Sequence, residues 1–292
     1  MQVLEEAVGA SANPWALRRE RATELAERYP HAAEILRLYQ ALASAQEAAF
    51  LEAQTSRPAT FPSPARGGGQ GGGPNFEDLV NLAIDRVLPG IVDATVSAGP
   101  PRLRDGVISV FATADLPALI QCWLDNQRLN PFETYLARAS TSPILEALPQ
   151  SRSTTRSLPL LGRVGEGVSD RLCPFCGGLP QVSYFAVSGE ALVSGPRYLV
   201  CSRCATNWIF SRMTCAGCGE TDGTKLPIFQ DDKQLPHVRV DGCRTCNRYL
   251  LTVDLRRDAR AVPIVDELAA LPLDLYATDQ GLTKITPNLM GS

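Results

Sequence analysis

Histidine, the residue that enzymes use most often for acid–base chemistry, is nearly absent: the 292-residue sequence contains two, His31 and His237. Neither belongs to a serine–histidine–aspartate pattern. The sequence also has no Walker loop and no dinucleotide-binding fingerprint of the kind that opens a helix after a strand. These absences predict a protein that is not an enzyme. We expect His31 to be an ordinary residue at the start of a helix and His237 to be a strand or surface residue.

Long apolar runs and strong net charge are lacking as well. No segment approaches the ~18 apolar residues of a membrane span, and the acidic start "MQVLEEAVGASANPW" has neither the basic nor the apolar region of a signal peptide. We therefore expect no membrane span and a cytoplasmic location. The net charge is −3 and the pI about 5.6, with only scattered basic residues between positions 171 and 260. This balance favours a protein partner and no nucleic acid, although a nucleic-acid-binding zinc ribbon remains an alternative.

Cysteine, by contrast, is plentiful. Eight of the nine cysteines form four Cys-x-x-Cys pairs: Cys173/Cys176, Cys201/Cys204, Cys215/Cys218 and Cys243/Cys246. Each cysteine of the first two pairs recurs 42 positions later, so the segment is a tandem repeat. In a reducing compartment such pairs indicate metal binding and not structural disulfides.

The repeat predicts two metal sites, one in each unit. The first consists of Cys173, Cys176, Cys201 and Cys204, and the second of Cys215, Cys218, Cys243 and Cys246. Four thiolates satisfy a tetrahedral ion, and either zinc or iron accepts this donor set. We therefore expect two metal ions, zinc or iron, one per four-cysteine site. A rubredoxin-like redox or electron-transfer protein with iron is a second alternative.

The residues after the pairs indicate the local fold. Gly177, Gly219 and Asn247 tolerate the left-handed backbone that such a turn often needs, whereas Ala205 departs from the pattern. The segments "QVSYFAV", "RYLV", "NWIF", "HVRV" and "RYLLTV" have the β-branched and aromatic content of short strands. Each unit thus resembles a zinc ribbon or rubredoxin knuckle, with Trp208 and Tyr249 packing in its small core.

The first half has the apolar periodicity of helices, with start signals at Asn13-Pro14, Asp115 and Asn130-Pro131. The fold class predicted is α+β, an all-α N-terminal helical domain followed by two tandem rubredoxin-like or zinc-ribbon modules. The predicted boundaries are 1–150 for the helical domain, with a flexible Gly/Pro-rich loop at 56–74, then 151–170 for a linker, 171–212 and 213–256 for the two ribbons, and 257–292 for a C-terminal tail or helix. Cys122, inside the apolar run "ALIQCWL", is expected to be a buried, inert thiol.

Four segments together resemble the C-terminal half of the formate dehydrogenase accessory protein family, FdhE: "CPFCGGLP", "RYLVCSRCATNWIFSRMTCAGCGE", "CRTCNRYLLTVDL" and "IVDELAALPLDLYATDQGLTKITPN". The resemblance covers residues 171 to 288 and is weaker in the helical half, at "RYPHAAEILRLYQALASAQ". It implies a cytoplasmic, non-catalytic assembly factor that binds the catalytic subunit of formate dehydrogenase and supports its maturation before export.

A partner surface is predicted where the ribbons meet the helical domain. The turns between paired cysteines should expose Arg203 and Arg244, whose guanidinium groups suit carboxylates or carbonyls of a protein partner. A homodimer is also possible on these grounds.

Overall fold

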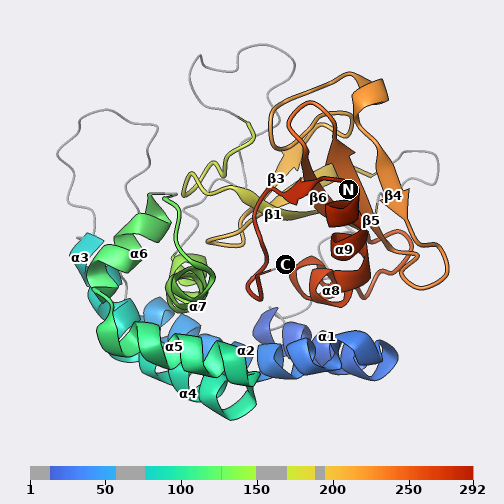
Figure 1. Ribbon diagram of the computed structural model, residues 1–292. Helices are drawn as coiled ribbons and strands as arrows, with labels where there is room; N and C mark the ends of the chain where they lie inside the picture. Colours follow the sequence, from blue (N-terminus) through green and yellow to red (C-terminus); the bar gives the residue numbers. More distant parts are fainter. Residues whose placement is uncertain (1–13, 57–75, 126, 149–169, 188–194, 292) are drawn as a thin grey trace, which may run out of the picture.

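The computed structural model describes residues 14–56, 76–125, 127–148, 170–187 and 195–291. Nearly all of the predicted Gly/Pro-rich loop at 56–74 and of the linker at 151–170 lies outside these ranges. Within them, a helical region precedes a sheet region that carries both four-cysteine groups, so the predicted α+β class is confirmed (Figure 1).

The helical region starts with a hairpin of two helices and continues with further helices. Its elements are α1 (Pro14–Arg28), the 3₁₀ turn η1 (Pro30–Ala32), α2 (Ala33–Ser56), α3 (Phe76–Leu82), the π-helical turn η2 (Ala83–Val87), α4 (Leu88–Ala98), α5 (Pro101–Thr113), α6 (Leu116–Leu124) and α7 (Pro131–Ala147). Among the described residues no single helix is long and apolar enough to cross a membrane; only α5 and α6 taken together, bent by 111°, meet that criterion.

Local sequence explains where the later helices begin. Asp115 caps α6 by accepting a hydrogen bond from the backbone N–H of Ala118 at 3.1 Å. Asn130 and Glu133 form a reciprocal capping box at the start of α7, which satisfies backbone groups that a helix terminus leaves open. From Tyr135 onward α7 is mostly buried, and Figure 1 shows it between the other helices and the sheet.

The two cysteine repeats fold as two equivalent meanders that join into one seven-stranded sheet. The strands are β1 (Pro180–Phe185), β2 (Arg197–Cys201), β3 (Asn207–Phe210), β4 (Ile228–Gln230), β5 (Val238–Cys243), β6 (Arg248–Asp254) and β7 (Thr283–Lys284). Their order is β3-β2-β1-β6-β5-β4, with β7 beside β6. Neighbours within each meander are antiparallel, and the meanders meet where β1 and β6 run parallel, with Val182 opposite Leu251.

The C-terminal segment, predicted as a tail or helix, packs between the sheet and the helical hairpin. It contains α8 (Pro263–Ala269) and α9 (Leu271–Asp279) before β7. Figure 1 shows α8 and α9 between the sheet and α1, and α8 contacts α1, α2, β1 and β6. Val265 and Ala269 of α8 are completely buried, so this segment ties the hairpin to the sheet.

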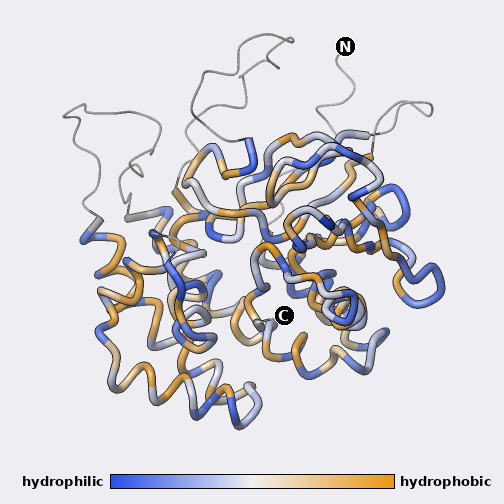
Figure 2. The backbone as a smooth tube through the Cα atoms, turned by 45° about the horizontal axis from the view of Figure 1, so that its top comes forward, coloured by the Kyte–Doolittle hydropathy of each residue, from blue (hydrophilic) through white to orange (hydrophobic). Residues whose placement is uncertain are grey.

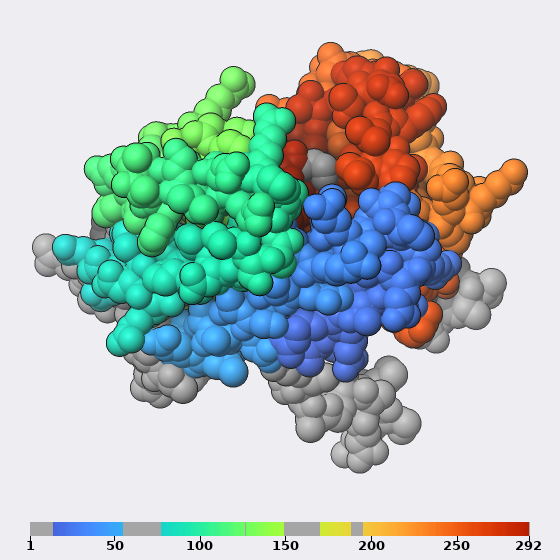
Figure 3. Space-filling view, turned by 60° about the horizontal axis from the view of Figure 1, so that its bottom comes forward, coloured from blue at the N-terminus to red at the C-terminus, as the bar shows by residue number. Residues whose placement is uncertain are grey.

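Both hydrophobic clusters contain residues from each side of the predicted domain boundary near residue 150. One cluster joins α2, α4 and α7 to the first cysteine group and to Ile285; the other joins α1 and α2 to Val182, Val253 and α8. Figure 2 shows apolar stretches along the backbone of both halves, and Figure 3 shows α1 and α2 bridging the helical and C-terminal regions on one face. The helical region and ribbons therefore share their cores, because neither buries its apolar surface alone.

Candidate metal centres

The first four-cysteine group is assembled from the turn before β1 and the turn after β2. The Sγ atoms of Cys173 and Cys204 are 3.7 Å apart, and those of Cys176 and Cys201 are 3.4 Å apart. All four side chains are buried. They come from positions separated by up to 31 residues, so the sheet register and not local sequence brings them together.

The second group is built in the same way from the turns before β4 and after β5. The Sγ atoms of Cys215 and Cys246 are 3.8 Å apart, and those of Cys218 and Cys243 are 3.7 Å apart. Cys215 and Cys243 are buried, whereas Cys218 and Cys246 are half-buried. The structure thus groups all eight cysteines as the 42-residue repeat predicts.

The sulfur geometry fits one tetrahedral ion per group. Four sulfurs at about 2.3 Å from a central ion stand about 3.8 Å from one another, and a disulfide would place two of them at about 2.05 Å. In both groups the four sulfurs lie within 4.8 Å of one another, and all are free thiols. The donor set is therefore suited to zinc or iron in each group.

All four turns share one backbone conformation. The residue after each pair has positive φ: 69° at Gly177, 84° at Gly219, and 52° at both Ala205 and Asn247. The sequence pattern suggested that Ala205 departs from this arrangement, but the structure shows that it adopts the same left-handed backbone despite its Cβ. The metal-binding turn dictates this conformation, and alanine occupies it at a steric cost.

Hydrogen bonds prepare the sulfurs for a cation. The backbone N–H of Arg203 donates to Cys201 Sγ at 3.4 Å, and that of Gly217 donates to Cys215 Sγ at 3.3 Å. Hydrogen bonds from neighbouring thiols lower the pKa of Cys173 and raise that of Cys204. Binding of a metal ion to such a site requires the thiols to lose their protons.

Arg203, predicted to be exposed for a partner, is buried. Only 3% of its surface is accessible, and its Nη2 donates to the carbonyl of Trp123 at 2.8 Å, with the guanidinium lying 5.7 Å from the Trp123 ring centroid. The prediction of an exposed Arg203 is wrong, because its side chain packs against Trp123 of α6. Arg244, the equivalent basic residue in the second ribbon, is exposed, and its Nη1 donates to the carbonyl of Gln280 at 3.2 Å.

Three other predicted residues are placed as follows. Cys122 is half-buried, which corrects the expectation of a fully buried thiol: it lies on α6, whose outer side faces away from the core. His237 is buried and contacts Asp266 Oδ1 through Nε2 at 2.8 Å, outside either cysteine group. His31 contacts the carbonyl of Ala269 through Nε2 at 3.0 Å.

Sequence inspection missed the buried charges that join the three regions. Arg21 of α1 binds Asp266 of α8, and the same carboxylate meets His237. Glu267 accepts a hydrogen bond from Gln181 of β1 and lies 3.5 Å from Lys284 Nζ. Burial raises the pKa of Glu267 to about 7, although the Lys284 and Arg138 cations oppose the rise. The only sequence signal was charge inside amphipathic segments, which does not reveal a partner some 245 residues away.

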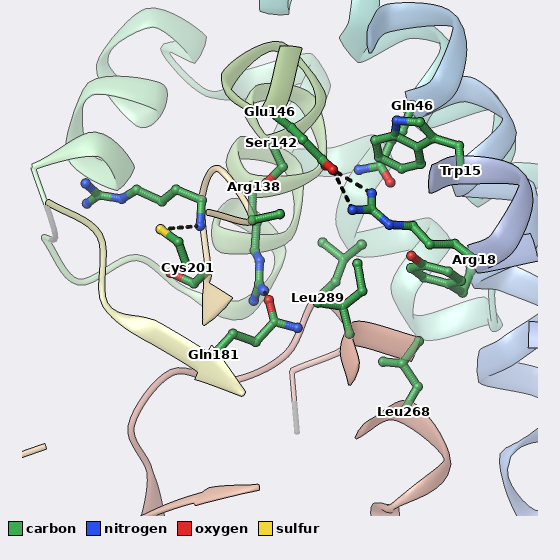
Figure 4. Close-up of a pocket in the computed structure, with 15 residues that line it drawn as sticks. Trp15, Arg18, Gln46, Arg138, Ser142, Glu146, Gln181, Cys201, Leu268 and Leu289 are labelled. Atoms are coloured by element: carbon green, nitrogen blue, oxygen red, sulfur yellow. Dashed lines mark hydrogen bonds and ion pairs between the residues drawn. The ribbon is translucent and has the colours of Figure 1, made fainter. Parts of the chain in front are cut away.

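A pocket of about 60 Å³ lies where the hairpin, α7 and the first ribbon meet (Figure 4). Arg18 holds Glu146 through two hydrogen bonds of 3.0 and 2.6 Å. Arg138 donates to Gln181 and to the carbonyl of Pro287. The charged groups in this pocket are therefore satisfied within the chain.

Comparison with known proteins finds family matches in the cysteine-rich part. Residues 172–212 match the FdhE central domain, and residues 213–290 match the FdhE C-terminal domain. The border between the matches falls at the seam between the two cysteine repeats. The resemblance to the FdhE family is therefore confirmed for residues 172–290.

Relatives and a solved structure agree with this match. The chain is similar to a protein named "Protein FdhE homolog" from Aquifex aeolicus, with 37% identity over 119 residues, 41% of each chain. A protein of the same name from Stutzerimonas stutzeri is 34% identical over 149 residues, 51% of this chain and 48% of that protein. The alignments thus span about half or less of these relatives. The crystal structure of the FdhE protein from Pseudomonas aeruginosa has a TM-score of 0.62 at 22% identity over 96% of both chains, which shows a shared fold.

Proposed function

We propose that this chain, with its FdhE central and C-terminal domains, is a non-catalytic accessory factor that binds the catalytic subunit of formate dehydrogenase and supports its maturation in the cytoplasm before export. The observation that carries the proposal is the uninterrupted FdhE match over 172–290, which contains both four-cysteine groups. The resemblance to the formate dehydrogenase accessory protein family supplies the client, and a chain built around two rigid knuckle pairs supports a binding role.

We further propose that each cysteine group holds one structural ion, zinc or iron. The sulfur spacing and the hydrogen bonds to Cys201 and Cys215 support tetrahedral coordination. Visible absorption of the purified protein distinguishes the metals, because ferric tetrathiolate is coloured and zinc tetrathiolate is not. Redox titration of a coloured protein then tests the electron-transfer alternative.

The client assignment is tested by affinity purification and gene deletion. The tagged chain, made at its native level, should retain the catalytic subunit of formate dehydrogenase. Deletion of the gene should abolish respiratory formate dehydrogenase activity while the subunit is still synthesised. Normal activity in a clean deletion strain with no related gene would refute the assignment, and a salt-sensitive shift of mixed DNA and RNA by the purified protein would support the nucleic-acid alternative.

A further inference from the structure

A second, smaller pocket lies between the two ribbons and is rich in arginine. Its volume is about 50 Å³, and its polar lining includes Arg197, Arg212, Arg239, Arg248 and Asp241. Four guanidinium groups and one carboxylate leave an excess of three positive charges. The pocket lies on the sheet face opposite α8 and α9, because Arg239 and Asp241 alternate along β5 with the core-facing valines.

The single carboxylate is already paired with two of these arginines, although its Oδ1 makes no hydrogen bond. Asp241 lies 3.1 Å from Arg197 Nη2 and 2.9 Å from Arg239 Nε, and it accepts a hydrogen bond from Thr252 Oγ1 at 2.6 Å. Burial and the nearby Arg239 cation lower the pKa of Arg197, against the influence of Asp241. The positive charge of this pocket is therefore only partly compensated.

Two arginines in the pocket have no carboxylate partner among the described residues, Arg212 and Arg248. Arg212 Nη2 is buried and makes no hydrogen bond. The guanidinium groups of Arg212, Arg239 and Arg256 lie 5.0, 4.7 and 5.0 Å from the centroid of the same Phe185 ring, so three like charges crowd one side chain. A buried guanidinium N–H without a partner costs stability until an acceptor reaches it.

The size and rim of the pocket identify the acceptor. A volume of about 50 Å³ holds roughly three or four water-sized groups, which suits a carboxylate and is far below the ~300 Å³ of an ordinary cofactor site. Met213 and Ile228, 60% and 53% exposed, stand at the rim. An exposed apolar pair beside a charged pocket is suited to a polypeptide segment, with an acidic side chain inside and apolar neighbours outside.

We propose that this pocket, lined by Arg197, Arg212, Arg239 and Arg248, binds an aspartate or glutamate side chain of a protein partner, with its apolar neighbours resting on Met213 and Ile228. The inference deepens the proposed function, on which it rests, by assigning a recognition surface. Charge-assisted, fork-shaped hydrogen bonds from arginine are well suited to a carboxylate.

The second cysteine group is a competing source of negative charge. Cys215 lines the pocket, and four thiolates around a divalent ion sum to about −2. This charge acts on the arginines at longer range but places no acceptor at hydrogen-bond distance from Arg212 Nη2. The number of bound metal ions must therefore be measured together with peptide binding.

The direct test follows the arginine Nε–H resonances of the full, metal-loaded chain during titration. The probes are the capped tripeptide acetyl-Leu-Glu-Leu-amide, its glutamine counterpart, acetate and inorganic phosphate. We expect the glutamate peptide to shift Arg212 and Arg248 saturably, and the glutamine peptide to leave them unchanged. Acetate should bind at least about tenfold more weakly, because it lacks the apolar flanks. Equal responses to both peptides overturn the proposal, and equal affinity for acetate or phosphate indicates a site for free anions only.

The matching variant is Arg212→Gln/Arg248→Gln. The control is Arg102→Gln/Arg128→Gln, which changes two exposed arginines, one on α5 and one between α6 and α7. The first variant should lose at least about tenfold in glutamate-peptide affinity and keep both ions, and the control should bind normally. Loss of the second ion would show that the arginines balance the cysteine group and would overturn the proposal. Co-purification of the formate dehydrogenase subunit is measured separately: if the unmodified chain fails to retain it, the client assignment fails while the peptide titration still decides the pocket.

Discussion

The two cysteine groups have the same turns and spacing but very different surroundings. All four sulfurs of the first group are buried, and Arg203 of its second turn donates to the carbonyl of Trp123 in α6. The second group leaves Cys218 and Cys246 half-buried, and its corresponding Arg244 is exposed. The duplicated motif therefore sets the arrangement of the four sulfurs in each group, whereas the neighbouring helices and strands set how far each group is exposed to solvent.

The largest expected effect comes from breaking one group at a time. Cys173→Ser/Cys201→Ser and Cys215→Ser/Cys243→Ser should each retain one of the two ions, as counted by native mass spectrometry. Structural zinc contributes roughly 10 kcal/mol in small domains. Loss of the first ion also exposes a core shared with α7, so this variant should lose protease resistance in the helical region, whereas the second should lose it mainly in the second ribbon. Loss of both ions in either variant would contradict the grouping.

A smaller change tests how tightly the first group is packed. In Gly178→Ala the new Cβ would lie 2.8 Å from Cys201 Sγ and 3.1 Å from Arg203 Cδ, so we expect a loss of about 3 kcal/mol in urea unfolding. Gly217→Ala, beside the second group although not at the equivalent repeat position, is the control, because its Cβ would lie 3.4 Å from Ile285 Cδ1 and 3.5 Å from Cys215 Sγ, which are ordinary contacts. Similar losses of unfolding free energy in the two variants would contradict tighter packing around the first cysteine group.

The enclosure of the first ribbon also buries a titrating carboxyl group. Burial raises the pKa of Glu267 to about 7, above the ordinary value of 4.5, so its contribution to folding is fully present below about pH 4.5 and is lost as the pH rises through 7. Between about pH 5 and pH 8 the contribution falls by about 2–3 kcal/mol. Glu267→Gln should flatten this part of the pH dependence of the unfolding free energy. An unchanged slope would show that Glu267 stays ionised.

The smallest effect compares the two alanine- or asparagine-bearing turns. Ala205 and Asn247 both have a φ of 52°, and asparagine adopts this backbone more readily than alanine. Ala205→Gly should raise the melting temperature, with a gain of up to about 1 kcal/mol, and Asn247→Gly should gain less. Scanning calorimetry of the metal-loaded proteins measures both, and a larger gain at Asn247 would contradict the steric explanation.

The amino-acid sequence by itself determined the helical half, the strands β1, β2, β3, β5 and β6, and the grouping of the cysteines. These features depend on local periodicity, on capping residues such as Asn130, and on a repeat that shows in the constant difference of 42 between cysteine positions. The sequence also predicted the left-handed backbone after the cysteine pairs at Gly177 and Gly219, because glycine tolerates a positive φ that a Cβ opposes.

Only the tertiary structure decided which surfaces remain open. The parallel pairing of β1 with β6, the burial of Arg203 and the contact between Arg21 and Asp266 join segments that are far apart in sequence. No local pattern encodes such contacts, since they arise when apolar faces of the hairpin, the sheet and α8 are buried together. For the same physical reason, two nearly identical cysteine motifs became one enclosed group and one partly open group.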